Sequence, residues 1–175
     1  MAKLHKFEGY NPEVIDFLSE LRKNNNKDWF DERRKFYEKS VRDVSKALIN
    51  DTGEQFVQKG MPFVADPKKS MFRINRDIRF SKNKDPYKTN IGIFFPYTMS
   101  QTGKKPILSV GLYFHVDPDT TFIAGGIHTP PSEALQAIRE RIAEEWQVLE
   151  KIISGKKFAK EFPVRLDTDK MLKRM

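Results

Sequence analysis

Three arginines lie in a run that otherwise alternates like a β-strand, and their spacing suggests an anion site. The run extends from Met71 to Phe80 and contains Arg73, Arg76 and Arg79. Eight basic and two acidic residues fall between positions 68 and 88, so this stretch carries +6 of the chain's formal net charge of +8. Guanidinium groups bind phosphate through paired hydrogen bonds, and lysines add point charges. Charge concentrated in this way predicts an anionic ligand or partner.

Arg76 is the first candidate site residue because of its place in the alternation. Alternate side chains of a strand share one face, which here would hold Arg76 among Phe72, Ile74, Ile78 and Phe80. A buried guanidinium is costly unless it is paired and hydrogen-bonded. A bound anion, a bulge or a carboxylate from elsewhere would each meet that demand. A buried arginine–carboxylate pair that stabilises the fold is therefore the main alternative.

The segment that follows the run supplies further candidate groups. Lys84, Tyr87 and Lys88 could add two positive charges and a hydroxyl donor to the anion site. Asp77 would orient an arginine, or would serve as a base if the protein is an enzyme. The glycine-rich phosphate loop G-x-x-x-x-G-K and the dinucleotide fingerprint G-x-G-x-x-G do not occur.

The same segment carries a resemblance to a known family. The pattern Arg-x-x-Arg-Asp-x-Arg-Phe-Ser-Lys-x-Lys-x-Pro-Tyr-Lys, from Arg73 to Lys88, resembles the signature of an uncharacterised family called domain of unknown function 2461. Other parts of the chain are also similar to that family: Asp28-Trp29-Phe30, Gly125-Gly126, Pro130-Pro131, Leu135 and Arg139. The resemblance implies no activity, cofactor or partner. It does imply that relatives continue beyond the position of Met175.

A histidine with nearby carboxylates forms a weaker candidate site. His115, Asp117 and Asp119 share strand parity, and His128 lies one expected hairpin away. Such groups can bind a divalent metal. Asp117-Pro118-Asp119 is also an ordinary turn, whose carboxylates bond backbone groups. We favour the turn, and we assign no metal site and no particular cofactor.

The elements that must position these residues form an α+β pattern. Asn11-Pro12-Glu13 starts a helix that should stop at Asn24-Asn25-Asn26. A second helix should begin near Asp28, with a possible interruption at Gly53. A last long helix should run from Thr129 to Gly155, on a stripe formed by Leu135, Ile138, Ile142, Trp146, Leu149 and Ile153. Five strands are expected between these helices: Phe63 to Ala65, Met71 to Phe80, Ile91 to Tyr97, Ile107 to Val116 and Thr120 to Gly126.

Short connectors between the strands favour an antiparallel arrangement, so the predicted fold is a largely antiparallel sheet of about five strands with helices packed on it. The chain of 175 residues is expected to form a single domain over residues 1–175. It contains no cysteine and no apolar run of membrane-spanning length. We therefore expect a cytoplasmic protein without a membrane partner, and the sequence leaves the oligomeric state open.

Three functions agree with these features. The first is an anion-binding domain that acts on or senses a phosphorylated small molecule or nucleotide. The second is a nucleic-acid-binding module in which aromatic residues interleaved with the basic ones stack on bases. The third is a structural or protein-interaction domain whose arginines pair internally. We rank them in that order, and the sequence alone does not say whether the protein is an enzyme.

Overall fold

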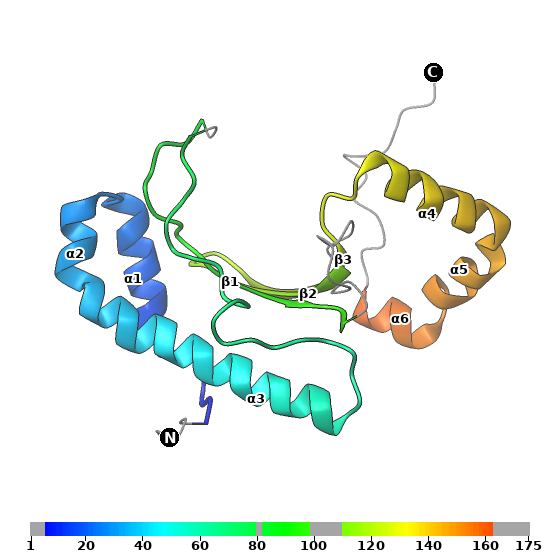
Figure 1. Ribbon diagram of the computed structural model, residues 1–175, viewed down its shortest axis with the longest axis horizontal. Helices are drawn as coiled ribbons and strands as arrows, with labels where there is room; N and C mark the ends of the chain where they lie inside the picture. Colours follow the sequence, from blue (N-terminus) through cyan, green and yellow to red (C-terminus); the bar gives the residue numbers. More distant parts are fainter. Residues whose placement is uncertain (1–5, 80–81, 99–109, 163–175) are drawn as a thin grey trace. The chain divides into compact units, whose positions relative to one another are not determined.

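The computed structural model describes residues 6–79, 82–98 and 110–162. Contacts divide the chain into two units, residues 1–129 and residues 130–175 (Figure 1). The first unit contains helices and an antiparallel sheet, and the second is helical where it is described. This mixture confirms the α+β class. The single domain expected over residues 1–175 stays a prediction.

The N-terminal helices begin where their capping residues predict. Helix α1 (Pro12–Lys23) is capped by Asn11, whose side chain accepts a hydrogen bond from the backbone N–H of Glu13 at 3.1 Å. Asn26 caps helix α2 (Lys27–Phe36) in the same way, through the backbone N–H of Trp29 at 3.0 Å. Between the two caps the chain turns, as the asparagine cluster indicates.

Helix α2 continues through η1 (Tyr37–Asp43), a π-helical segment, into α3 (Val44–Gln58). Gly53 does not interrupt α3, contrary to the possible break noted in the sequence. A Cβ at this position would lie 3.0 Å from the Cβ of Ala65, so the glycine allows the following segment to approach the helix closely. Gly60, with a φ of 61°, ends the helical region, and the N–H of Met61 bonds back to the carbonyl of Phe56 at 2.8 Å.

The sheet has three antiparallel strands in the order β1-β2-β3. Strand β1 (Ile91–Pro96) pairs with β2 (Val110–Val116), and β2 pairs with β3 (Thr121–Ile127). The register places Gly92 opposite His115, and His115 opposite Phe122. These three positions therefore lie side by side on one face of the sheet.

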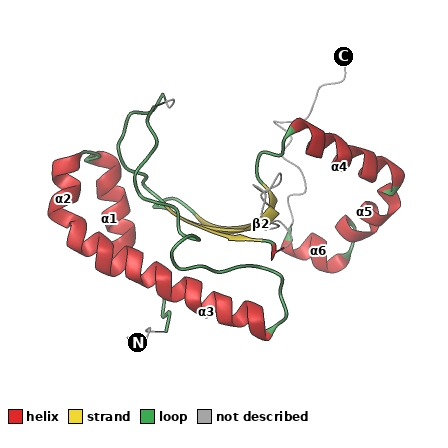
Figure 2. Cartoon of the chain, in the orientation of Figure 1, coloured by secondary structure: helices red, strands yellow, loops and turns green. Residues whose placement is uncertain are grey.

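The prediction of about five strands is wrong, because two of the expected strands form only isolated contacts. Phe63 makes a single bridge to Tyr97, and residues 71–79 make single bridges at Met71 and Asn75. Figure 2 shows the chain between α3 and the sheet as loop. Phe72 and Ile78 are 46% and 38% exposed, so the inward face inferred from the alternation does not exist. A regular strand here would have required the sheet to bury the Arg76 guanidinium, and the chain leaves the ladder instead. Residues 80 and 107–109 of the expected strands lie outside the described residues.

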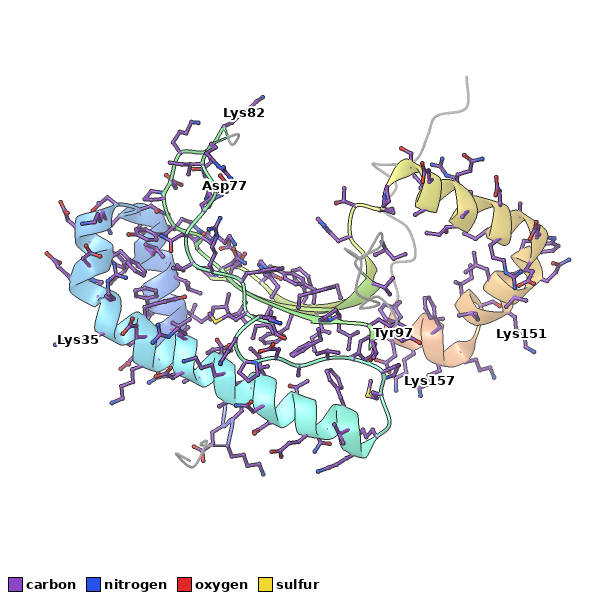
Figure 3. The ribbon with its side chains drawn as sticks, viewed as in Figure 1. Lys35, Asp77, Lys82, Tyr97, Lys151 and Lys157 are labelled. Atoms are coloured by element: carbon purple, nitrogen blue, oxygen red, sulfur yellow. The ribbon has the colours of Figure 1, made fainter. Side chains whose placement is uncertain are left out.

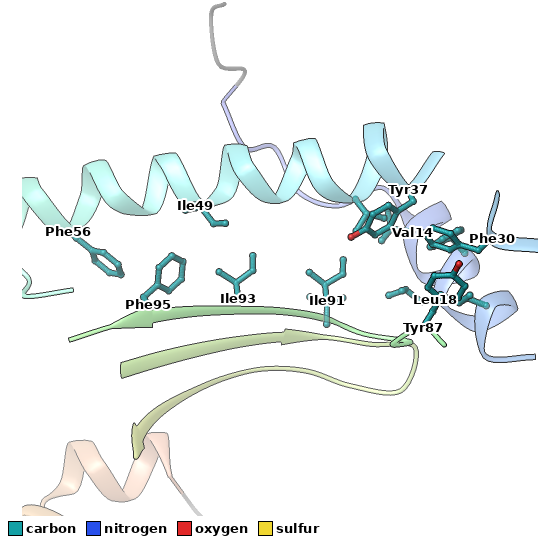
Figure 4. Packing of buried hydrophobic residues seen from close by; sticks show 14 residues of the cluster. Val14, Leu18, Phe30, Tyr37, Ile49, Phe56, Tyr87, Ile91, Ile93 and Phe95 are labelled. Atoms are coloured by element: carbon teal, nitrogen blue, oxygen red, sulfur yellow. The ribbon is translucent and has the colours of Figure 1, made fainter. Parts of the chain in front are cut away.

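The core lies between the N-terminal helices, from α1 to α3, and one face of β1 (Figure 4). Ile91, Ile93 and Phe95 alternate along the strand and are buried against the helical side, where Ile49 and Phe56 of α3 face them. The opposite face of β1 and β2 carries Gly92, Phe94, Tyr113 and His115, and we call it the open face.

The long C-terminal helix is also a wrong prediction. Three helices occupy this region: α4 (Ser132–Glu144), α5 (Trp146–Ile153) and α6 (Lys156–Glu161). The backbone leaves the helical conformation at Glu145, with φ −126° and ψ 39°. Most helical stability comes from tertiary packing of the apolar face. Trp146 and Ile142 of the predicted stripe remain 52% and 41% exposed, so packing does little to keep this helix straight.

Candidate anion-binding site

The charged segment forms an irregular hairpin, which we call the basic hairpin, from residues 71–79 and 82–88 (Figure 3). Its two arms are joined by backbone hydrogen bonds from Arg76 N to Pro86 O and from Lys88 N to Ile74 O, both 2.8 Å. Its base is attached to the sheet by a 2.9 Å bond from Phe72 N to Gly92 O. The hairpin therefore lies against the start of β1.

Arg76 is a half-buried charged group of the hairpin whose hydrogen bonds are incomplete. One terminal nitrogen donates to the carbonyl of Tyr87 at 3.4 Å, which is a long bond. Its Nε is buried and has no hydrogen-bond partner among the described residues. No carboxylate in the described part of the chain forms an ion pair with this side chain. An uncompensated and partly buried guanidinium is the feature that an anion would satisfy.

Two more cations lie close to Arg76. Burial lowers the pKa of Lys88, and the positive charges of Arg73 and Arg76 lower it further. The charges of Arg73 and Arg76 therefore both act on Lys88, and we call Arg73, Arg76 and Lys88 the cationic cluster. Bringing like charges together is unfavourable unless an opposite charge compensates them.

Asp77 and Arg79 form a pair beside the cluster. Arg79 donates two hydrogen bonds to the Asp77 carboxylate, from Nε at 3.0 Å and from a terminal nitrogen at 2.7 Å. Hydrogen bonds from the side chain and backbone of Arg79 hold the pKa of Asp77 below its ordinary value, and the charge of Arg73 contributes further. Of the two roles considered for Asp77, this geometry favours orienting an arginine, because a depressed pKa makes a weaker base.

Lys84 and Tyr87 have contacts that support the hairpin itself. The Nζ of Lys84 donates to the carbonyl of Ile78 at 2.9 Å and so joins the two arms near the tip. The ring of Tyr87 is 5% exposed and stacks on Phe30 at a centroid distance of 4.1 Å. Asn25 brackets the Tyr87 backbone, accepting from its N–H and donating to its carbonyl, each at 3.0 Å. Both residues hold the cluster in place from outside it.

A second polar group lies on the open face of the sheet. The hydroxyl of Tyr113 is 2.9 Å from Nδ1 of His115, and Nε2 of His115 is 3.1 Å from the carboxylate of Asp117. Phe122 stacks on the His115 ring at 4.8 Å between centroids. Burial raises the pKa of Tyr113, although a hydrogen bond from Asn90 acts in the opposite direction.

Asp117 also organises the turn that leads to β3. One of its carboxylate oxygens accepts hydrogen bonds from the backbone N–H groups of Asp119 and Thr120, both at 2.8 Å. Burial pushes the pKa of Asp117 upward, but the hydrogen bonds from His115, Thr120 and Asp119 outweigh it and hold the pKa below its ordinary value.

The other groups of the possible metal site have different partners. Asp119 pairs with Arg22 at 2.7 Å, and His128 Nδ1 lies 3.0 Å from the Thr129 hydroxyl. In residues 6–79, 82–98 and 110–162, no group of three or more histidines and carboxylates is placed to hold a metal ion.

One aromatic residue connects the cationic cluster to the open face. The Nζ of Lys88 lies 5.4 Å from the centroid of the Phe72 ring, and that ring lies 6.1 Å from the ring of Tyr113. Gly92 lies beneath both rings, since a Cβ there would be 2.9 Å from both Phe72 Cδ2 and the Tyr113 hydroxyl oxygen. The glycine is therefore what allows the two side chains to meet over β1.

A family model described as "Conserved hypothetical protein (DUF2461)" matches residues 13–175. The chain belongs to the DUF2461 family. This confirms the resemblance seen in the residues from Arg73 to Lys88. No curated protein and no solved structure matches the chain. Among the described helices of this DUF2461 member, none is long and apolar enough to cross a membrane.

Two members of the open-face group were not singled out in the sequence. Tyr113 is two residues before His115, so strand parity alone would have placed it on the same face. Asn90 precedes β1, and only the β1–β2 register of the folded DUF2461 chain brings it near them. The sequence offered a signal for the first residue and none for the second.

Proposed function

We propose that this protein binds an anionic small molecule, a phosphorylated metabolite or nucleotide, at the cationic cluster. The observation that carries the proposal is the buried Nε of Arg76, which has no partner among the described residues. A bound phosphate would supply the negative charge that no carboxylate in the described part of the chain gives to this guanidinium. The proposal leaves open whether the protein acts on this ligand or senses it.

The charge arrangement supports a phosphate rather than a single carboxylate. Arg73, Arg76 and Lys88 together offer three positive charges, which match a dianion better than a monoanion. Arginine presents a planar fork to two oxygens, and lysine adds a point charge. The exposed charges of Lys82 and Lys84 on the same hairpin would raise the positive potential that an approaching anion meets.

Thermal unfolding tests the proposal, because a ligand that binds only the folded state raises the midpoint. The panel contains inorganic phosphate, mononucleotides and short oligonucleotides, with and without Mg²⁺, at two salt concentrations. We expect phosphate and mononucleotides to raise the midpoint, and we expect the rise to survive the higher salt. Arg76→Gln and Lys88→Gln should remove it.

Arg22→Gln is the matched control. Arg22 is a surface arginine whose charge is already paired with Asp119, so its removal changes the net charge equally without touching the cluster. A rise confined to oligonucleotides and erased by salt would instead support the nucleic-acid-binding module. No rise with any member of the panel would refute the anion site and leave the arginines as internal structure.

A further inference from the structure

The open face beside the cationic cluster has the composition of a second half of a ligand site. Phe72 and Phe122 are 46% and 42% exposed, and between them lie Tyr113 and His115. Phe72 contacts both halves, because it packs against Tyr113 and lies under the Nζ of Lys88. An exposed aromatic surface next to a polar group binds flat rings well, since every flat ring offers a face for stacking.

The hydrogen bonds among Tyr113, His115 and Asp117 determine which donor and acceptor sites remain for a ligand. A carboxylate only accepts, so Nε2 of His115 carries the proton that it donates to Asp117, and in a neutral ring Nδ1 is then an acceptor. The Tyr113 hydroxyl, at 2.9 Å, can donate its proton to that Nδ1, and it lies closer than the Asn90 side-chain nitrogen at 3.5 Å. Its oxygen retains acceptor sites, because the proton of a hydroxyl occupies neither of its lone pairs. The Tyr113 oxygen can therefore accept a hydrogen bond from a ligand.

We propose that Phe72 and Tyr113 form a subsite for the organic part of the ligand whose phosphate binds Arg73, Arg76 and Lys88. The subsite takes a flat ring that carries an N–H or O–H donor, as the base of a mononucleotide does. Phe72 provides the stacking surface, Tyr113 accepts the hydrogen bond, and His115 and Asp117 are positioning residues that hold the Tyr113 proton. This inference rests on the proposed function, because the phosphate must be bound for the ring to be placed here.

Three probes separate the contributions: inorganic phosphate, phenyl phosphate and 4-aminophenyl phosphate, each titrated into the full chain by calorimetry near pH 8. Stacking is worth about 1–3 kcal/mol, so phenyl phosphate should bind about 5- to 160-fold more tightly than phosphate. One neutral hydrogen bond should give the amino compound a further gain of about 2- to 10-fold over phenyl phosphate.

Two variants assign each gain to a residue. Phe72→Ala should remove most of the advantage of phenyl phosphate over phosphate. Tyr113→Phe should leave that advantage intact and remove the additional gain of the amino compound. His115→Gln tests the positioning role, because a Tyr113 hydroxyl released from Nδ1 can donate, so the preference for the amino compound should fall while phosphate affinity is unchanged. His128→Gln is the control, since among the described residues His128 bonds only to its neighbour Thr129.

The outcomes distinguish the two proposals. If inorganic phosphate binds and phenyl phosphate binds no more tightly, the subsite is refuted and the anion site stands. If 4-aminophenyl phosphate binds more tightly than phenyl phosphate by the same factor in Tyr113→Phe as in the unmodified protein, the hydrogen-bonding role of Tyr113 is refuted. If none of the three probes binds, the proposed function is overturned and the subsite with it. Nuclear magnetic resonance of the Phe72 and Tyr113 rings keeps the test valid should a variant fold poorly, because the expected ligand moves these resonances in the unmodified protein.

Discussion

Replacing Arg76 by methionine should stabilise the protein in the absence of ligand and remove its response to phosphate. Methionine keeps most of the apolar stem of arginine and has neither the charge nor the buried Nε. The lost bond to the Tyr87 carbonyl is 3.4 Å long, and Asn25 still donates to that carbonyl at 3.0 Å. The substitution therefore removes a poorly satisfied donor without creating a new one.

The expected size follows from these contacts. A buried donor without a partner costs about 1–3 kcal/mol, and loss of the long hydrogen bond offsets part of the gain. Removing repulsion with Lys88 and Arg73 adds a further favourable contribution, which is larger at low salt. We expect a net increase of about 1 kcal/mol in the free energy of unfolding, or roughly 2–4 °C in the midpoint for a chain of this size.

The assay is urea unfolding of the unmodified protein, Arg76→Met and the control Arg22→Met, with and without saturating phosphate. Arg22 forms an exposed ion pair with Asp119, so its loss should cost between about 0 and 1 kcal/mol. Without phosphate Arg76→Met should be the most stable of the three, and with phosphate the unmodified protein should overtake it. A loss of about 2 kcal/mol or more in Arg76→Met without ligand would refute the reasoning, because it would mean that Arg76 has an internal partner.

Three further predictions concern the fold. Gly111→Ala should lower the free energy of unfolding in urea by more than about 2 kcal/mol, because a Cβ there would overlap the carbonyl of Phe95. Gly125→Ala should cost less, since its Cβ would meet only a leucine methyl at 3.2 Å. Equal losses in the two variants would contradict this geometry. Ile93→Ala should cost about 2–5 kcal/mol, because the side chain is fully buried, and a loss under 1 kcal/mol would place it outside the core. Burial raises the pKa of Tyr10 from 10 to about 12, so the folded state holds this proton more tightly than the unfolded state. The stability that this group contributes is complete below pH 10 and is lost as the pH rises to about 12. The difference in the free energy of unfolding between the unmodified protein and Tyr10→Phe should therefore shrink by roughly 2–3 kcal/mol across that range. A constant difference would contradict the assignment.

Local signals in the sequence determined the ends of the N-terminal helices and the three strands of the sheet. Caps act within one turn, so Asn11 and Asn26 define their helices without help from distant residues. Strand β1 formed where its alternation is satisfied on a buried face, by Ile91, Ile93 and Phe95. Strand β3 formed without a buried face, since six of its seven residues are exposed. The family was also readable, because its signature is a continuous segment.

The two wrong predictions of secondary structure concern elements whose formation depends on a distant part of the chain. Alternation predicted a strand over Met71 to Phe80. A strand also needs a neighbouring strand that pairs with it along its whole length, whereas this segment forms only isolated bridges. An arginine on the inward face disfavours such pairing. The apolar stripe predicted one long C-terminal helix, but a stripe that remains exposed adds little packing energy to keep the helix straight.

The sequence by itself determined which residues carry the charge and which family the chain resembles. The tertiary structure decided which of those charges act together. It paired Asp77 with Arg79, packed Tyr87 into the core, and placed Arg73 and Arg76 where the charge of each acts on Lys88. It also decided that Phe72 and Tyr113 meet over Gly92, although 40 residues lie between these two positions in the sequence. The physical reason is that electrostatic and packing energies depend on distances in space, which the order of residues along a chain does not contain.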